Sequence, residues 1–242
     1  MTGRQLALDS DFRRAGLVAV LGIGSSPGKT NVMADRAVRE LGGSADSIDV
    51  AAAGRDPRAS GAFSPPYAVQ TLIDELTLAP VVLRDGQPVE IEPLAPGGTV
   101  DYGPPIGNVE TIHTLHSELA TFGESFGCRE ASFRLSLAPA LLSRLRELAS
   151  APAEEVSRAT REAVARSAET VSVDVVIARG GLTATGALPP ERCIEPEPLF
   201  AELESRGCRF EVLDATGTRI RAGHGVERCH QQALHAAGWE GV

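Results

Sequence analysis

The stretch Gly22–Asn31, "GIGSSPGKTN", has the residue types and spacing closest to those of a phosphate-binding loop. It lies between an apolar run, "GLVAVL", and a helix-like run, "VMADRAVREL". A strand that leads through a glycine turn into a helix directs backbone N–H groups and the positive helix end at one point, which suits a phosphate. Lys29 and Thr30 would add a charge and a hydroxyl to such a site.

The stretch departs from each of the two familiar phosphate-loop patterns at one residue. The P-loop pattern, G-x-x-x-x-G-K-[ST], needs a glycine where the chain has Ile23, and Pro27 has no N–H to offer inside the loop. The dinucleotide pattern, G-x-G-x-x-G, fits its first two glycines but meets Pro27 at the third, while Asp49 and Asp56 lie near the distance expected for a ribose-binding acid. A tight turn that only packs a helix on a sheet is the third interpretation.

A second pattern, H-x-x-H, is formed by His113 and His116 in "ETIHTLHSE". On a helix this spacing would place both imidazoles on one face, as a metal pair requires. The segment is rich in threonine and other strand formers, and in a strand the same spacing points the two rings to opposite faces. We therefore predict a structural or substrate-facing role for them and no metal site.

Composition excludes several classes of function. The chain has 242 residues, is 43% apolar, and carries 23 basic against 32 acidic residues, for a net charge of -9. This charge argues against nucleic acid or an anionic membrane as the partner. No apolar run reaches the ~18 residues of a membrane span, and the first 14 residues are too charged for a signal peptide. With four scattered cysteines, the sequence predicts a cytoplasmic protein with free thiols.

The elements that would position the glycine loop form a βαβ pattern. Leu17–Leu21 is a continuous apolar strand, residues 32–41 have helical spacing, and Ser47–Ala53 is a second strand. Such a unit predicts two strands in one parallel sheet, joined by a right-handed crossover.

The rest of the chain alternates hairpin and helix patterns. "PVVLRDGQPVEIEPL" predicts a hairpin around Asp85-Gly86, residues 129–137 alternate as a half-exposed strand does, and residues 139–149, 153–168 and 197–206 have helical patterns. A strand is expected at 171–178 and two short strands follow the last helix. The predicted class is α/β, with a partial Rossmann-like βαβ unit and an α+β domain that has a mixed or antiparallel sheet. The expected units are 1–56, 57–178, a return segment 179–220 and a flexible tail 221–242.

Three separated segments resemble one family. They are "LGIGSSPGKTNVMADRAVREL", "GAFSPPYAVQTLIDEL" with "DYGPPIGNVETIHTLHSELATF", and "GALPPERCIEPEPLFAELESRG". Together they are similar to the saccharopine dehydrogenase family of NAD(P)-dependent oxidoreductases, in its reductase-like branch. The most specific marks are G-x-x-P-G-x-x-N in the loop and the later P-P-E turn.

The resemblance implies a cofactor, a reaction and a set of contacts. Ser26, Pro27 and Gly28 would contact the nicotinamide and ribose side of NADP or NAD, with Ser64 as a further cofactor-binding candidate. Asn31 would cap the helix start. The reaction would be hydride transfer to a small-molecule substrate, in a homodimer.

Departures from the family pattern leave alternatives open. The family's first strand and its true G-x-G-x-x-G have no counterpart here, so the chain resembles a C-terminal portion without the first Rossmann half. "YGPPIGN" also lacks the arginine that amino-acid-binding members place nearby. A non-catalytic dimerisation or ligand-binding domain is the alternative, and a P-loop nucleotide-binding protein is a remote one.

Overall fold

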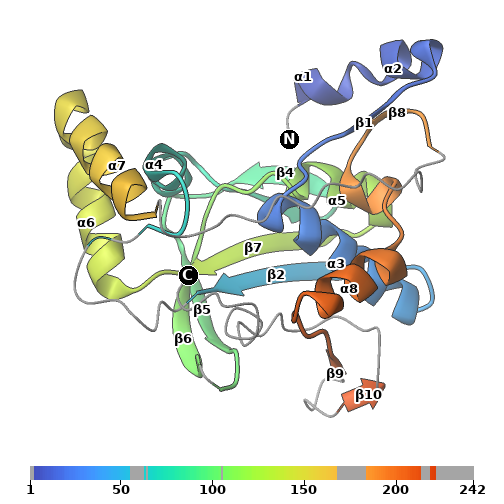
Figure 1. Cartoon of the computed structure of the whole chain (residues 1–242). Helices are drawn as coiled ribbons and strands as arrows, with labels where there is room; N and C mark the ends of the chain where they lie inside the picture. Colours follow the sequence, from blue (N-terminus) through green and yellow to red (C-terminus); the bar gives the residue numbers. More distant parts are fainter. Residues whose placement is uncertain are drawn as a thin grey trace.

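The chain is described by a computed structural model that covers residues 3–54, 63, 65–104, 106–167, 184–213 and 219–221 (Figure 1). The strand expected at 171–178, the residue Ser64 and the tail beyond Arg221 lie outside these described residues. The elements are, in order, α1 (Gly3–Leu6), α2 (Asp9–Ala15), β1 (Val18–Val20), the turn η1 (Ser25–Lys29), α3 (Thr30–Glu40), β2 (Ser47–Ala53), α4 (Val69–Thr77), β3 (Val81–Arg84), β4 (Gln87–Glu90), β5 (Pro96–Asp101), β6 (Asn108–His113), α5 (Leu119–Phe126), β7 (Glu130–Ser136), α6 (Pro139–Ala149), α7 (Ala153–Ser167), β8 (Gly186–Leu188), the turn η2 (Pro190–Arg192), α8 (Pro196–Ser205), β9 (Val212–Leu213) and β10 (Arg219–Arg221).

The larger sheet is built around β7. Within the described residues it has six strands, in the order β4-β3-β7-β6-β5, with β2 also paired to β7. β2 runs parallel to β7 over its whole length, from Ser47 opposite Glu130 to Ala53 opposite Ser136. The other edge of β7 is shared by two antiparallel strands, β3 near its start and β6 near its end. The mixed α/β class predicted from the sequence is thereby confirmed.

The hairpin expected around Asp85-Gly86 is confirmed. Arg84 pairs with Gln87, so the loop between β3 and β4 has two residues. Asp85 and Gly86 both have positive φ, 51° and 76°. This is the backbone that a two-residue hairpin requires, because it matches the twist of the flanking strands.

One face of the sheet is covered by helices and forms the core. The alternation predicted for β7 holds, since Ala131, Phe133 and Leu135 are buried while the intervening residues face the other side. α5 and α3 cover this face through Phe122 and Ala34. A second apolar cluster joins α4, α6 and α7, which gather at one end of the sheet in Figure 1.

The two strands that flank α3 do not share a sheet. β1 pairs in parallel with β8, from Val18 opposite Gly186 to Val20 opposite Leu188, whereas β2 belongs to the larger sheet. The elements of the βαβ pattern are therefore present, but the expected single parallel sheet is not formed by β1 and β2. No residue of β2 is buried, and its first four alternate between exposed and half-buried. β2 instead pairs in parallel with β7, whose buried residues alternate.

Packing around β1, α3 and α8 makes a third apolar cluster, which includes Val32, Phe200 and Phe210. None of the helices in the described ranges is long and apolar enough to cross a membrane. The unit boundaries predicted from the sequence stay predictions.

Candidate functional site

The proline-glycine turn lies between β1 and α3, at the carboxyl end of β1. Ser26–Pro27 is a cis peptide bond, and Gly28 has φ 129° and ψ −90°. A Cβ at Gly28 would lie 3.2 Å from the carbonyl oxygen of Gly22, so the turn requires glycine for both its backbone angles and its packing. Ser26 and Pro27 are half-buried, and Gly28 is buried.

The N–H groups of this turn are used internally. Gly28 N–H donates to Asn31 Oδ1 at 2.8 Å, Lys29 N–H donates to the Gly24 carbonyl at 2.9 Å, and Thr30 N–H donates to the Ser25 carbonyl. A phosphate nest needs converging N–H groups that are free to bind an anion. The geometry therefore weighs against a phosphate at this point.

Asn31 joins the turn to a distant part of the chain. Its side chain is fully buried, and its Nδ2 donates to Glu191 Oε2 at 2.8 Å while its Oδ1 holds Gly28. Glu191 lies in η2, the P-P-E turn at the carboxyl end of β8. Asn31 was expected to cap the helix start, but α3 begins without a side-chain cap hydrogen bond, and Asn31 instead bonds to the turn before the helix. The same amide connects the two turns that follow the parallel pair β1 and β8.

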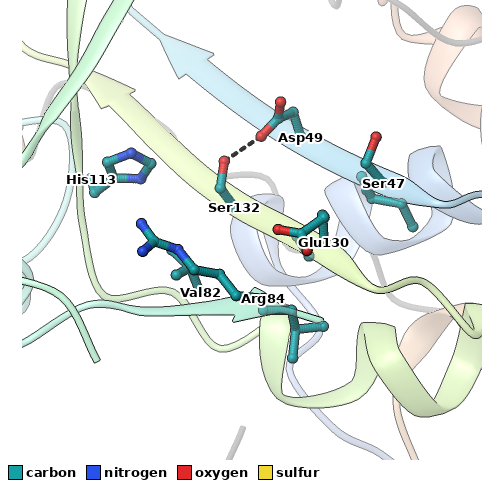
Figure 2. Close-up of a pocket in the computed structure, with 10 residues that line it drawn as sticks. Ser47, Asp49, Val82, Arg84, His113, Glu130 and Ser132 are labelled. Carbon is teal, nitrogen blue, oxygen red and sulfur yellow. Dashed lines mark hydrogen bonds between the residues drawn. The ribbon is translucent and has the colours of Figure 1, made fainter. Parts of the chain in front are cut away.

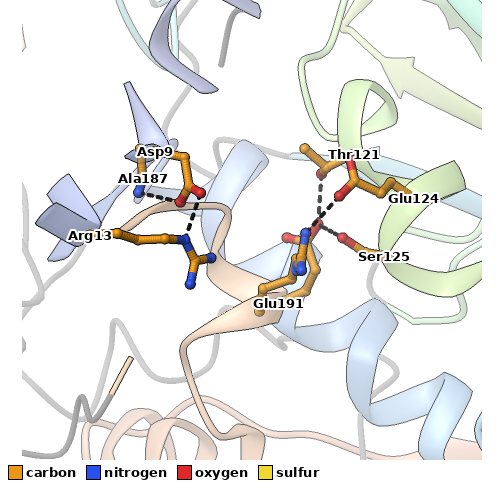
Figure 3. A network of polar contacts seen from close by, with 8 residues as sticks. Asp9, Arg13, Thr121, Glu124, Ser125, Ala187 and Glu191 are labelled. Atoms are coloured by element: carbon orange, nitrogen blue, oxygen red, sulfur yellow. Dashed lines mark hydrogen bonds and ion pairs between the residues drawn. The ribbon is translucent and has the colours of Figure 1, made fainter. Parts of the chain in front are cut away.

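Glu191 is held by three donors, of which Thr121 and Ser125 are seen in Figure 3. Besides Asn31, Thr121 Oγ1 donates to Glu191 Oε1 at 2.6 Å and Ser125 Oγ donates to the same oxygen at 2.9 Å. Thr121 and Ser125 are one turn apart on α5 and so face the same way. This buried carboxylate, 6% exposed, is well satisfied and fastens α3, α5 and η2 together.

A second buried carboxyl, Glu118, also bonds to the first turn of α3. Thr30 Oγ1 donates to Glu118 Oε1 at 2.8 Å, and Glu118 is 0% exposed. Its Oε2 has no hydrogen-bond partner among the described residues. Burial raises the pKa of Glu118 above its ordinary value. A carboxyl in this setting favours its neutral, protonated form.

Glu75, on α4, adds a third carboxyl to this group. Burial raises its pKa to about 7, and the charge of Glu118 acts in the same direction. The Tyr67 hydroxyl donates to Glu75 Oε2 at 2.5 Å, which opposes the rise. Tyr67 is 40% exposed, so it connects this buried carboxyl to the surface.

His116 completes the group from the core side of the sheet. Its ring stacks on Phe133 with centroids 3.5 Å apart, and its Nε2 lies 3.9 Å from Glu75 Oε1. Burial lowers the pKa of His116 to about 4, so the ring is neutral at pH 7 and the contact with Glu75 is not an ion pair there. The group can hold and exchange a proton near neutral pH through Glu75, which is the chemistry a general acid or base needs.

The histidine pair predicted from the sequence is divided between two environments. His113, at the end of β6, lines a cavity of about 210 Å³ on the face of the sheet that lies away from α5 (Figure 2). Arg84, Asp49 and Ser132 line the same cavity, and the Ser132 hydroxyl donates to Asp49. His116 instead lies in the core. In the part of the chain that the structure describes, no group of three or more histidine, cysteine or acidic side chains is placed to hold a metal.

The other candidate residues fall as follows. Ser26, Pro27 and Gly28 form one turn, Ser64 lies outside the described residues, and Lys29 is half-buried beside the turn. Sequence reasoning missed Glu75, Tyr67 and the roles of the two buried glutamates. The sequence pointed to Glu118 only because it lies near the two histidines. It pointed to Glu191 only because it belongs to the P-P-E turn.

Two comparisons with known proteins find no match. A scan against protein-family models finds no match, and neither does a comparison with curated protein sequences.

Proposed function

We propose that this chain supplies the substrate side of an NAD(P)-dependent oxidoreductase that resembles the saccharopine dehydrogenase family. The turn at Ser26, Pro27 and Gly28 faces the nicotinamide end of the cofactor, and the buried acids behind it handle the proton. A bound nicotinamide supplies the hydride for reduction of a small-molecule substrate.

The observation that carries the proposal is the convergence of the three segments on which the resemblance rests. Thr30 bonds to Glu118, and Asn31 bonds to Glu191. These bonds join residues that are 88 and 160 positions apart in the chain. Each pair links the loop segment to one of the other two segments. Segments that recur together for a shared site are expected to meet in space, whereas a chance similarity carries no such expectation.

The residues present fit one end of such a cofactor. The turn exposes Ile23 to 49% and offers the ring of Pro27, which suits a flat, weakly polar ring better than a phosphate. The internally bonded N–H groups of Gly28 and Lys29 leave no pyrophosphate cradle at this point. We therefore assign the turn to the nicotinamide side only.

The same bonds disfavour a P-loop. The Thr30 hydroxyl, which would bind magnesium there, donates to Glu118 instead. A Lys29→Ala variant should therefore bind nucleotides as the unmodified chain does.

Titration of the purified chain with NADPH, followed by nicotinamide fluorescence, tests the proposal. We expect saturable enhancement that Gly28→Ala abolishes, because the added Cβ meets the Gly22 carbonyl. Gly54→Ala is the matched control, since Gly54 has open space around its Cβ position and no positive φ. An unchanged fluorescence signal at millimolar NADPH would contradict cofactor binding by this chain. It would favour the alternative, a non-catalytic dimerisation or ligand-binding domain.

A further inference from the structure

A cavity of about 220 Å³ borders the Glu191 network on the side away from Asn31. One wall comes from α2, with Asp9 and Arg13, and the opposite wall comes from α5 and η2, with Glu124 and Arg192. Figure 3 shows Asp9 and Arg13 facing the group around Glu191 across this space. At ~30 Å³ for each water molecule, the cavity has room for a ligand of about seven non-hydrogen atoms.

Two guanidinium groups line this space, and each has donors beyond its ion pair. Arg13 Nε donates to Asp9 Oδ2 at 2.7 Å, and Arg192 Nη1 donates to Glu124 Oε1 at 2.8 Å. Both arginine side chains are about half exposed, at 52% and 45%. A guanidinium has five N–H donors, so a single bond from one nitrogen leaves a fork that fits a carboxylate or a phosphate.

The charges of the two arginines act on the same region. The pKa of Asp9 is lowered, first by the hydrogen bond from Arg13 and to a smaller extent by the charge of Arg192. Arg13 and Arg192 line this one cavity, so the two guanidinium groups can act on one bound group.

The carboxylates that now pair with these arginines differ in how firmly they are placed. Asp9 Oδ1 also accepts the N–H of Ala187 at 3.0 Å, which fixes it on β8. Glu124 is 78% exposed, and an ion pair between such solvated groups contributes about 0–1 kcal/mol. An incoming oxyanion can replace Glu124 at Arg192 at little cost.

We propose that this cavity binds a small molecule through a carboxylate or phosphate group held between Arg13 and Arg192. The hydroxyls of Thr121 and Ser125 border the same space, and Leu188 and Pro189 give it an apolar floor. The ligand is thus a small oxyanion with a short apolar or hydroxylated remainder. This site is separate from the proline-glycine turn, so the proposal stands without the cofactor assignment.

Binding to the full chain, followed by NMR chemical shifts at constant ionic strength, tests this site. The probes are malonate, inorganic phosphate and the neutral malonamide. We expect saturable shifts with malonate, phosphate or both, and none with malonamide. The anion that binds tells whether the site favours a carboxylate or a phosphate.

Variants connect the binding to the two arginines. Arg13→Gln or Arg192→Gln should weaken binding about tenfold, because a charge-assisted hydrogen bond is lost. Arg206→Gln is the matched control, since Arg206 is also half exposed and pairs with an acid, Glu202. Glu124→Gln should bind the anion more tightly, because it frees Arg192, and its exposed position leaves folding unaffected.

Two results would overturn the site. One is the absence of saturable shifts with both anions at tens of millimolar. The other is a set of variant affinities that does not single out the cavity arginines. Equal weakening by Arg192→Gln and Arg206→Gln would show general charge attraction. Weaker binding in Glu124→Gln would show that freeing Arg192 does not help the anion to bind.

Discussion

Two buried glutamates, Glu118 and Glu191, both bond to the first turn of α3 but differ in how many hydrogen bonds they receive. Glu191 receives hydrogen bonds from Asn31, Thr121 and Ser125. Glu118 receives one from the Thr30 hydroxyl and keeps an oxygen without a partner among the described residues. A satisfied buried carboxylate fixes structure, whereas one with a free oxygen and a raised pKa is available for proton chemistry.

Removing the Glu191 carboxylate should have the largest effect. Glu191→Ala leaves two buried donors, Asn31 and Thr121, and the half-buried Ser125 without an acceptor, and each buried unsatisfied group costs about 1–3 kcal/mol. We expect the free energy of unfolding, measured in urea, to fall by roughly 3 kcal/mol or more. Glu124→Ala, at an exposed position on the same helix as two of the donors, should change it by about 0.5 kcal/mol or less. A loss below about 1 kcal/mol in Glu191→Ala would show that water replaces the carboxylate.

The pH dependence of stability should report the group around Glu118. The pKa of Glu75 is raised from 4.5 to about 7, so its contribution is full below pH 4.5 and is lost as the pH rises toward 7. The pKa of His116 is lowered from 6.5 to about 4, so its contribution is full above pH 6.5 and is lost as the pH falls toward 4. Each shift corresponds to about 3 kcal/mol at most, and the two contributions oppose each other between pH 4.5 and 6.5.

Single variants separate these opposed contributions. Relative to the unmodified chain, Glu75→Gln should make the slope of stability against pH more positive across this window, because the falling contribution of Glu75 is removed. His116→Phe should make that slope more negative, because the rising contribution of His116 is removed while those of Glu75 and Glu118 remain. Urea unfolding at several pH values checks both slopes, and parallel profiles in the two variants would contradict the assignment.

A change from carboxyl to amide should distinguish the two glutamates at constant size. In Glu191→Gln, an NH₂ group replaces one acceptor oxygen and faces other donors, either the Thr121 and Ser125 hydroxyls or the Asn31 amide. This should lower the free energy of unfolding by about 1–3 kcal/mol. Glu118→Gln keeps an acceptor oxygen for Thr30 and removes a charge that burial disfavours, so the cost should be under about 1 kcal/mol. Equal losses of unfolding free energy at pH 7 in the two variants would contradict the distinction between a carboxylate that fixes the structure and a carboxyl that is available for proton transfer.

A modest effect is expected at Tyr67. Tyr67→Phe removes one hydrogen bond at a partly exposed position, for a loss of about 1 kcal/mol. Since that bond lowers the pKa of Glu75, the variant should shift the Glu75 titration to higher pH. Carboxyl ¹³C chemical shifts followed against pH would detect this, and a shift to lower pH would contradict it.

Local signals in the sequence predicted the elements well. Asp85-Gly86 between two β runs and the strict alternation along β7 each depend on neighbours in the chain, and both are confirmed. The partners of β1 and β2 were not predicted correctly, because strand pairing depends on segments far apart and the βαβ pattern does not encode them. The same limit explains Glu118, whose burial depends on Thr30, 88 residues away. The turn at Gly28 was recognised from its residue types, but the internal use of its N–H groups became visible only in three dimensions.

The shared edge of β7 has a consequence for how the molecule opens. Within the described strands, β2 pairs with β7 at seven positions. β3 pairs with β7 through Leu83, and β6 pairs with β7 through Ile112 and His113. Each outer hairpin can therefore fray from β7 without the other. Amide hydrogen exchange should be slowest along β2 and β7 and faster, at two independent rates, in the hairpins β3–β4 and β5–β6.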